Sequence, residues 1–396
     1  MSLMSLLSAL THPRTARTAQ PAIDRLLLGV VICLSMFGLL MVYSASIALT
    51  DGPEYHGYGR YYFVIRHAIF MGLGVLCALA AAMVPMKRWQ EWAIPLFAVG
   101  LILLVIVLIP GIGREVNGAR RWIPLGGINL QPSEVMKVLM LLYAADYTVR
   151  KQAHLSGFVR GLMPMILSVL VVGGLLLLEP DLGAFIVIGA IAMGLIFIGG
   201  LNLKHFALMT VGLLGSFFAL IWYYPWRRQR LFVYLDPWNP ENVYGSAYQL
   251  SHSLIAFGRG EWFGVGLGAS VEKLHYLPEA HTDFIAAVIG EELGFVGVAA
   301  LVAVFAFIVW RCFDIGRQAI ALERVFGAMV AYGVGLWFGV QTFINIGVSL
   351  GLLPTKGLTL PMVSYGGSAI VTTFVAVALL FRVDYENRRL MRGKSR

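Results

Sequence analysis

The chain has 396 residues, of which 59% are hydrophobic and only 13% are charged, and its mean hydropathy is +0.78. Soluble proteins are close to half apolar and a quarter charged, so this composition excludes a soluble enzyme, a disordered protein and a nucleic-acid-binding domain. The net charge of +9 does not change this conclusion, because the basic residues cluster beside apolar segments. The three cysteines lie far apart and predict neither a disulfide framework nor a metal site.

Ten apolar segments are long enough to cross the hydrocarbon core of a bilayer, which requires about 20 residues. The sequence therefore predicts an all-α polytopic membrane protein with ten transmembrane helices. These are expected at residues 25–48, 62–84, 92–110, 132–149, 160–178, 182–200, 204–225, 283–310, 323–350 and 361–382.

The distribution of Lys and Arg favours a cytoplasmic N-terminus, because the segments that would then lie inside are the richer in both residues. With an even number of spans, both termini are expected in the cytoplasm. Three parts follow: a cytoplasmic N-terminal tail at 1–24, the ten-helix domain at 25–382 and a basic cytoplasmic tail at 383–396. The outer, periplasmic face receives a loop at 111–131 and a large loop at about 226–282, between the seventh and eighth helices. Aromatic residues and glycines favour an ordered large loop over a flexible linker.

Polar residues interrupt the apolar pattern first around the fourth span. The preceding outer loop carries Arg114, Arg120 and Arg121, and Pro132 favours a helix start. Glu134 and Lys137 are three residues apart, a spacing that puts them on one helix face. We expect them to form a buried ion pair, which is either purely structural or also shapes a polar cavity.

Two further outer turns carry polar residues. In the sequence EPDLG at 179–183, Asp181 is expected to cap the sixth helix. The sequence PTKG at 354–357 and the glycine-rich run at 364–368 interrupt the last outer hairpin. Irregular backbone at membrane depth is tolerated only where it is buried in protein or lines a water-filled cavity. Lys356 is then either an interfacial lysine or a ligand for an anionic group.

The large loop enters the eighth span through His281, Thr282 and Asp283. Two interpretations are open: Thr282 or Asp283 caps the helix, or Asp283 is a functional carboxylate. Glu291 and Glu292 lie about 12 Å further along the helix. They either form a structural ion pair with a basic partner or border one cavity with Asp283.

Together, an outer carboxylate and several cations beside a membrane groove suit chemistry on a lipid-linked anionic substrate. A base would activate a hydroxyl, and the cations would hold a phosphate leaving group. Composition alone does not separate this chemistry from transport of an anionic lipid.

Several motifs closely resemble those of the SEDS proteins (shape, elongation, division and sporulation). They are LPEAHTDF at 277–284, IGEELG at 289–294, QPSE at 131–134, EPDLG at 179–183 and PTKGLTLP at 354–361. The likeness covers about residues 25–385. Ala280, Gly290 and the basic N-terminal tail resemble the division-type members more than the elongation-type members.

The resemblance implies a peptidoglycan glycosyltransferase of the bacterial inner membrane that polymerises lipid II during septal wall synthesis. Asp283 corresponds to the essential aspartate of the family and is the expected catalytic residue. It would deprotonate the 4-hydroxyl of the acceptor N-acetylglucosamine, orient that hydroxyl or bind a metal. The oxygen would attack C1 of the donor N-acetylmuramic acid with inversion, form a β-1,4 bond and release undecaprenyl diphosphate.

The remaining site residues are assigned in two groups. Substrate binding is expected of Lys356, Arg114, Arg120, Arg121 and Glu291. Support of the cavity is expected of Glu134, Lys137, Asp181, Glu292 and His281.

No cofactor is expected with certainty. A magnesium or manganese ion could help Lys356 and the arginines to neutralise the diphosphate, but no all-protein metal site is expected. The resemblance implies a class B penicillin-binding protein as partner, together with other division proteins, and no nucleic acid. Two alternatives remain: a lipid II flippase and a non-catalytic membrane scaffold for the penicillin-binding protein. An outer carboxylate favours chemistry over flipping, and a scaffold would not need Asp283.

Overall fold

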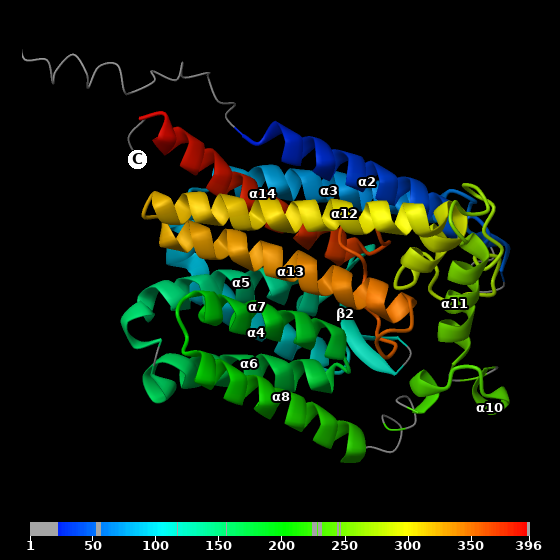
Figure 1. Ribbon diagram of the computed structural model, residues 1–396, viewed down its shortest axis with the longest axis horizontal. Coiled ribbons are helices and arrows are strands. Elements are labelled where there is room, and N and C mark those ends of the chain that lie inside the picture. Colours follow the sequence, from blue (N-terminus) through cyan, green and yellow to red (C-terminus); the bar gives the residue numbers. More distant parts are fainter. Residues whose placement is uncertain are drawn as a thin grey trace, which may run out of the picture.

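The computed structural model describes residues 23–52, 57–116, 118–155, 157–223, 228, 232–243, 245 and 247–393. Of the expected N-terminal tail, only the last two residues are among them. Long helices lie side by side along one direction and make up most of this part of the chain (Figure 1).

The bundle contains the helices that the apolar segments predict. They are α2 (Arg25–Ser46), α3 (Tyr62–Met83), α4 (Met86–Leu108), α5 (Pro132–Arg150), α6 (Met163–Leu178), α7 (Leu182–Ile198), α8 (Leu203–Tyr223), α12 (Ile285–Ala321), α13 (Val325–Ser349) and α14 (Gly367–Met391).

Within the described residues, seven helical segments are long and apolar enough to cross a membrane. They contain α2, α3, α4, α6, α12, α13 and α14. The other three expected spans coincide with α5, which carries buried charges, with α7, which has only 17 residues, and with α8. A helical, multi-span membrane protein is therefore confirmed at this coarser level.

The loop before α5 differs from the expected all-α architecture, because a small antiparallel sheet that the sequence did not predict forms there. Its strands, in spatial order, are β1 (Arg114–Val116), β2 (Ala119–Leu125) and β3 (Ile128–Leu130). Gly126 and Gly127 both adopt positive φ angles, of 54° and 97°, in the two-residue turn between β2 and β3. Such a turn matches the twist of paired strands, and glycine adopts it without steric cost. Short strands of this kind leave little periodicity in the sequence.

The expected large loop is folded in part. It contains α10 (Pro240–Val243) and α11 (Tyr248–Gly260). Figure 1 places α10, α11 and β2 at one end of the bundle, whereas the C-terminal end of α14 lies at the opposite end.

Helix α12 is interrupted at Gly294, whose φ of 66° and ψ of −165° are not helical. The large loop supplies hydrogen bonds on both sides of this break. The amide of Val265 donates to the carbonyl of Glu291 (2.9 Å), and the amide of Phe295 donates to the carbonyl of Glu261 (2.8 Å). Helix and loop therefore form one hydrogen-bonded unit. The helix continues to Ala321, well beyond the expected end of this span. The prediction stopped early because the last turns of the helix carry charged residues, which a search for apolar segments leaves out.

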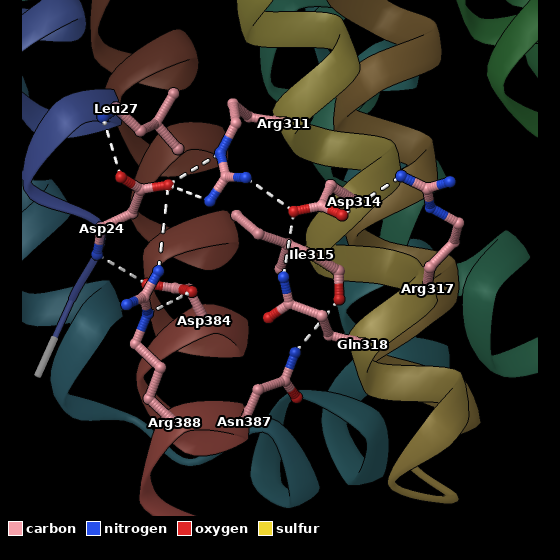
Figure 2. A network of polar contacts seen from close by, with 10 residues as sticks. All are labelled: Asp24, Leu27, Arg311, Asp314, Ile315, Arg317, Gln318, Asp384, Asn387 and Arg388. Atoms are coloured by element: carbon pink, nitrogen blue, oxygen red, sulfur yellow. Dashed lines mark hydrogen bonds and ion pairs between the residues drawn. The ribbon is translucent and has the colours of Figure 1, made fainter. Parts of the chain in front are cut away.

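Charged side chains join three helices at the end of the bundle that bears the C-terminus (Figure 2). The amide of Asp24, just before α2, donates to Asp384 on α14 (2.8 Å), and Arg311 on α12 donates to Asp24 through Nε (2.8 Å). Arg388 pairs with Asp384 (2.8 Å). Helix α14 thus continues to Met391 as part of the packed bundle, so most of the segment expected as a tail at 383–396 is helical.

Candidate active site

A polar cavity of about 460 Å³ lies where the sheet, the large loop and three interhelical turns meet. Its walls come from β2, the turn between α6 and α7, α11, the turn before α12 and the segment between α13 and α14. The polar and charged lining residues include Arg121, Asp181, Tyr234, Gln249, Asp283, Thr355 and Lys356. Carboxylates and cations that are far apart in sequence therefore share one cavity, which we call the outer pocket.

Asp283 lies two residues before α12, and its side chain is partly exposed in the outer pocket. It does not cap the helix, because Phe284 occupies the N-cap position without a side-chain hydrogen bond. Thr282 does not cap it either, since its hydroxyl donates to Glu279 (2.5 Å). Burial by the surrounding protein, followed by the negative charge of Glu279, raises the pKa of Asp283 to about 7, against the opposing effect of Arg121.

The segment that carries Lys356 passes directly over the Asp283 carboxylate. A Cβ atom on Gly357 would lie only 2.7 Å from Oδ2 of Asp283, so a side chain at this position would displace the carboxylate. The approach brings Lys356 and Asp283 to the same pocket from segments more than 70 residues apart.

Of the three predicted arginines, the structure brings Arg121 to the pocket. Its Nε donates to the carbonyl of Glu179 (3.0 Å) and its Nη2 to that of Pro180 (2.5 Å). Neighbouring side chains on a strand point to opposite faces, and Arg120 accordingly pairs with Glu115 instead (3.0 Å). Arg114 and Arg120 lie outside the pocket lining.

Asp181 caps α7 as predicted, because its Oδ1 accepts a hydrogen bond from the amide of Ala184 (3.1 Å). Its Oδ2 accepts from Ser133 in the first turn of α5 (2.7 Å), so the aspartate also joins two helices beside the pocket. Glu179 in the same turn is fully buried, and neither carboxyl oxygen has a hydrogen-bond partner among the described residues. Burial and then the charge of Asp181 raise the pKa of Glu179 to about 8, which keeps this carboxyl protonated near neutral pH.

The predicted pair on α5 is present. Nζ of Lys137 lies 2.8 Å from Oε1 of Glu134, and Lys137 is completely buried. Nζ of Lys137 also donates to Oε1 of Gln341 on α13 (3.0 Å) and lies over the ring of Trp337. A buried ammonium group requires such partners.

Glu291 and Glu292 are both fully buried and lie outside the pocket lining. Glu291 accepts hydrogen bonds from Ser270 (2.5 Å) and from the amide of Val271 (3.0 Å), and Glu292 pairs with Lys273 (2.6 Å). The expectation that they border one cavity with Asp283 is therefore wrong, because the large loop covers them. Their contacts match the other interpretation, a structural ion pair, and they attach the large loop to α12.

His281 also lies outside the pocket lining, although it is two residues from Asp283. Its ring packs against Phe63 and Tyr365, at centroid distances of 5.0 and 5.3 Å. Burial lowers the pKa of His281 to about 4, so the ring is neutral at physiological pH. These contacts are those of a packing residue beside the catalytic candidate.

The sequence alone predicts no role for the buried amides Gln341 and Asn345, or for Tyr234 and Gln249, which line the pocket from the large loop. The amides had a usable signal, since two polar residues four apart inside an apolar span are rare and usually functional. Tyr234 and Gln249 had no such signal, because both lie in short helical stretches outside the apolar spans, where a polar side chain is ordinary. Within the described residues, no three His, Cys, Asp or Glu side chains gather as metal ligands.

Comparison with protein families matches residues 24–389 to the family described as "Cell cycle protein" (FTSW_RODA_SPOVE). A probable peptidoglycan glycosyltransferase FtsW from Burkholderia thailandensis is 58% identical over 388 residues, which cover 98% of this chain and 84% of that protein. The protein with the same description from Aromatoleum aromaticum is 57% identical over 371 residues, with coverages of 94% and 90%.

Solved structures show the same likeness. A chain from a peptidoglycan synthase complex, solved to describe the structural coordination of polymerization and crosslinking, superposes with a TM-score of 0.73 at 28% identity. The superposition covers 92% of this chain and 98% of that one. The rod shape determining protein RodA of Thermus thermophilus gives a TM-score of 0.65 at 29% identity, with coverages of 93% and 98%.

Proposed function

The chain belongs to the FTSW_RODA_SPOVE family of cell cycle proteins and is a peptidoglycan glycosyltransferase, and from this premise we propose that it joins lipid II units in the outer pocket. The observation that carries the proposal is the position of Asp283. Its carboxyl group has a pKa of about 7 and lies in one cavity with Lys356 and Arg121. A base whose pKa is close to the working pH is effective in proton transfer.

The reaction follows from this arrangement. The Asp283 carboxylate accepts the proton of the acceptor's 4-hydroxyl as that oxygen attacks C1 of the donor sugar. The bond between C1 and the lipid diphosphate breaks, and undecaprenyl diphosphate leaves with the bonding electrons. Lys356 and Arg121 line the same pocket and would stabilise the growing negative charge. The products are a β-1,4-linked glycan and a protonated Asp283.

The proposal includes a divalent cation only if the diphosphate of the substrate supplies some of the oxygen atoms that bind it. The described residues contain no metal-binding cluster of their own, and Asp181 and Asp283 are the carboxylates that line the pocket. Their oxygens are ligands of the kind that magnesium prefers.

We also propose that the chain crosses the membrane ten times. Length and hydropathy alone support seven of these spans, and α5, α7 and α8 are the other three. The outer pocket then faces the periplasm, and both termini face the cytoplasm. The excess of Lys and Arg on the side of the termini supports this arrangement.

We further propose a septal location in the inner membrane, a class B penicillin-binding protein as partner, and contacts with other division proteins. The likeness to a chain of a peptidoglycan synthase complex supports a partner that crosslinks the glycan. In this proposal the partner supplies the crosslinking activity.

The test compares purified wild-type protein and Asp283→Asn with lipid II and the penicillin-binding protein present. Glu115→Gln serves as the control, because Glu115 lies at the same end of the bundle but pairs with Arg120 outside the pocket. We expect glycan chains from wild type and from Glu115→Gln, and none from a correctly folded Asp283→Asn. Polymerisation by Asp283→Asn at near the wild-type rate would overturn the proposal and leave the scaffold as the better account. Movement of fluorescent lipid II across vesicles without any polymer would favour the flippase.

A further inference from the structure

Two buried amides on α13 contact the segments that carry the reacting groups. Gln341 and Asn345 are one helical turn apart, and the two residues are 1% and 2% exposed. Nδ2 of Asn345 donates to the carbonyl of Asp283 (2.8 Å) and to that of Leu358 (2.6 Å). One side chain thus bridges the turn that carries Asp283 and the segment that follows Lys356.

Much of the bridged backbone lies outside regular secondary structure. The segment from Pro354 to Leu360 forms neither helix nor strand, and the carbonyl of Asp283 precedes the first turn of α12. Buried carbonyl groups outside regular structure need donors from side chains or water. Asn345 supplies both of its amide hydrogens to this purpose.

Two hydrogen-bond donors fix the orientation of the Gln341 side chain. Its Oε1 accepts from Nζ of Lys137 (3.0 Å) and from Nε1 of Trp337 (2.7 Å), so its amide nitrogen must point the other way. Nε2 accordingly donates to the carbonyl of Thr359 (2.7 Å), the residue after the one that Asn345 holds. Gln341 therefore connects the ion pair Glu134–Lys137 to the segment that carries Lys356 by hydrogen bonds.

We propose that Asn345 is a positioning residue of the glycosyl transfer, which holds Asp283 and Lys356 at a fixed separation across the outer pocket, with Gln341 as its support. The inference rests on the proposed function, because it assumes that Asp283 and Lys356 act on one substrate. It assigns Asn345 no contact with that substrate. A longer or shorter separation would leave each group in the pocket but misplace one of them for the reaction.

The experiment measures kcat and KM for lipid II in Asn345→Ala, Asn345→Ser and Asn345→Asp. Alanine removes both hydrogen bonds, serine retains a donor for at most one carbonyl, and an ionised aspartate turns acceptor oxygens toward two carbonyl groups. Misplacement by about 1 Å can cost about a hundredfold in rate. We expect kcat to fall by about that factor in Asn345→Ala and further in Asn345→Asp, with Asn345→Ser between wild type and alanine, and KM to change by less than about threefold.

Thr342→Val is the matched control. Thr342 lies on the same helix at similar burial, and its hydroxyl has no hydrogen-bond partner among the described residues. Valine has nearly the same shape, so we expect wild-type kcat. Thermal unfolding of each variant in detergent identifies any that does not fold, and the serine variant keeps the comparison possible if alanine is unstable.

Three outcomes overturn the inference: wild-type kcat in Asn345→Ala, equal rates in the serine and alanine variants, or an equal loss in Thr342→Val. If any of these occurs while Asp283→Asn is inactive, the proposed function stands and the positioning role fails. If Asp283→Asn polymerises normally, the proposed function itself has failed.

Discussion

The carboxyl group of Asp283 has to serve two opposing requirements. An ordinary aspartate, with a pKa of about 4, is a weak base toward a sugar hydroxyl. Burial raises the pKa of Asp283 because the charged form loses hydration, and Arg121 limits the rise so that the carboxylate is still populated near neutral pH. The pocket thus provides a stronger base without suppressing its active form.

This balance predicts a pH dependence. The base acts only when deprotonated, so kcat/KM should rise with pH, level off above about 7 and fall roughly tenfold per unit at lower pH. Initial rates of lipid II polymerisation between pH 5 and 8 would check it. A profile that is flat down to pH 5 would show that Asp283 titrates as an ordinary carboxyl or is not the base.

The cations of the pocket make a second prediction at this scale. Loss of one charged partner of the diphosphate costs about 1.5–3 kcal/mol, so Lys356→Ala and Arg121→Ala should each lower kcat/KM by roughly 10- to 100-fold. Arg120→Ala should stay within about threefold of wild type, because Arg120 pairs with Glu115 outside the pocket. Steady-state kinetics with lipid II distinguish them, and equal losses in Arg120→Ala and Arg121→Ala would contradict the assignment.

Among the elements, the interrupted helix α12 connects the large loop to the bundle. Its amides and carbonyls beside Gly294 are satisfied by the loop, and Glu291 and Glu292 bind Ser270 and Lys273 from the same loop. The glutamates therefore attach the large loop to α12 and do not line the pocket. The sequence indicates that two adjacent charges in a span need partners, but it does not identify them, because the partners lie on a loop whose path has no periodic signal.

The break itself can be tested by Gly294→Ala. A Cβ atom there would lie 2.4 Å from the backbone nitrogen of Gly264, and the φ of 66° disfavours any L side chain. We expect a loss of about 1–3 kcal/mol in the free energy of unfolding and a lower Tm in detergent. Gly174→Ala on α6 is the control, since nothing lies within 4 Å of its added Cβ. A Tm for Gly294→Ala equal to that of Gly174→Ala would show that the break adapts freely.

At the scale of the whole molecule, the physics of the bilayer explains how much could be predicted. A membrane helix needs a long apolar run, so the ten long helices of the bundle are predictable from the sequence, whereas α10 and α11 in the large loop are not. The pair Glu134–Lys137 is predictable from its spacing. The sheet at 114–130 and the choice of Arg121 over Arg114 and Arg120 depend on strand pairing and on contacts between distant segments. The motifs named Asp283 as the catalytic candidate, but only the folded chain shows the burial that raises its pKa.

The arrangement of the whole chain across the membrane gives the last prediction. Ten spans place the α7–α8 turn and the C-terminus on the cytoplasmic side, whereas seven spans would place the two termini on opposite sides. Cysteines at the exposed positions Glu241, Lys204 and Arg392 distinguish these arrangements, once Cys33, Cys77 and Cys312 have been replaced by serine. In cells with a permeabilised outer membrane, a membrane-impermeant maleimide should label Glu241→Cys at once. It should label Lys204→Cys and Arg392→Cys only after lysis, and labelling of either before lysis would exclude the ten-span arrangement with a periplasmic pocket.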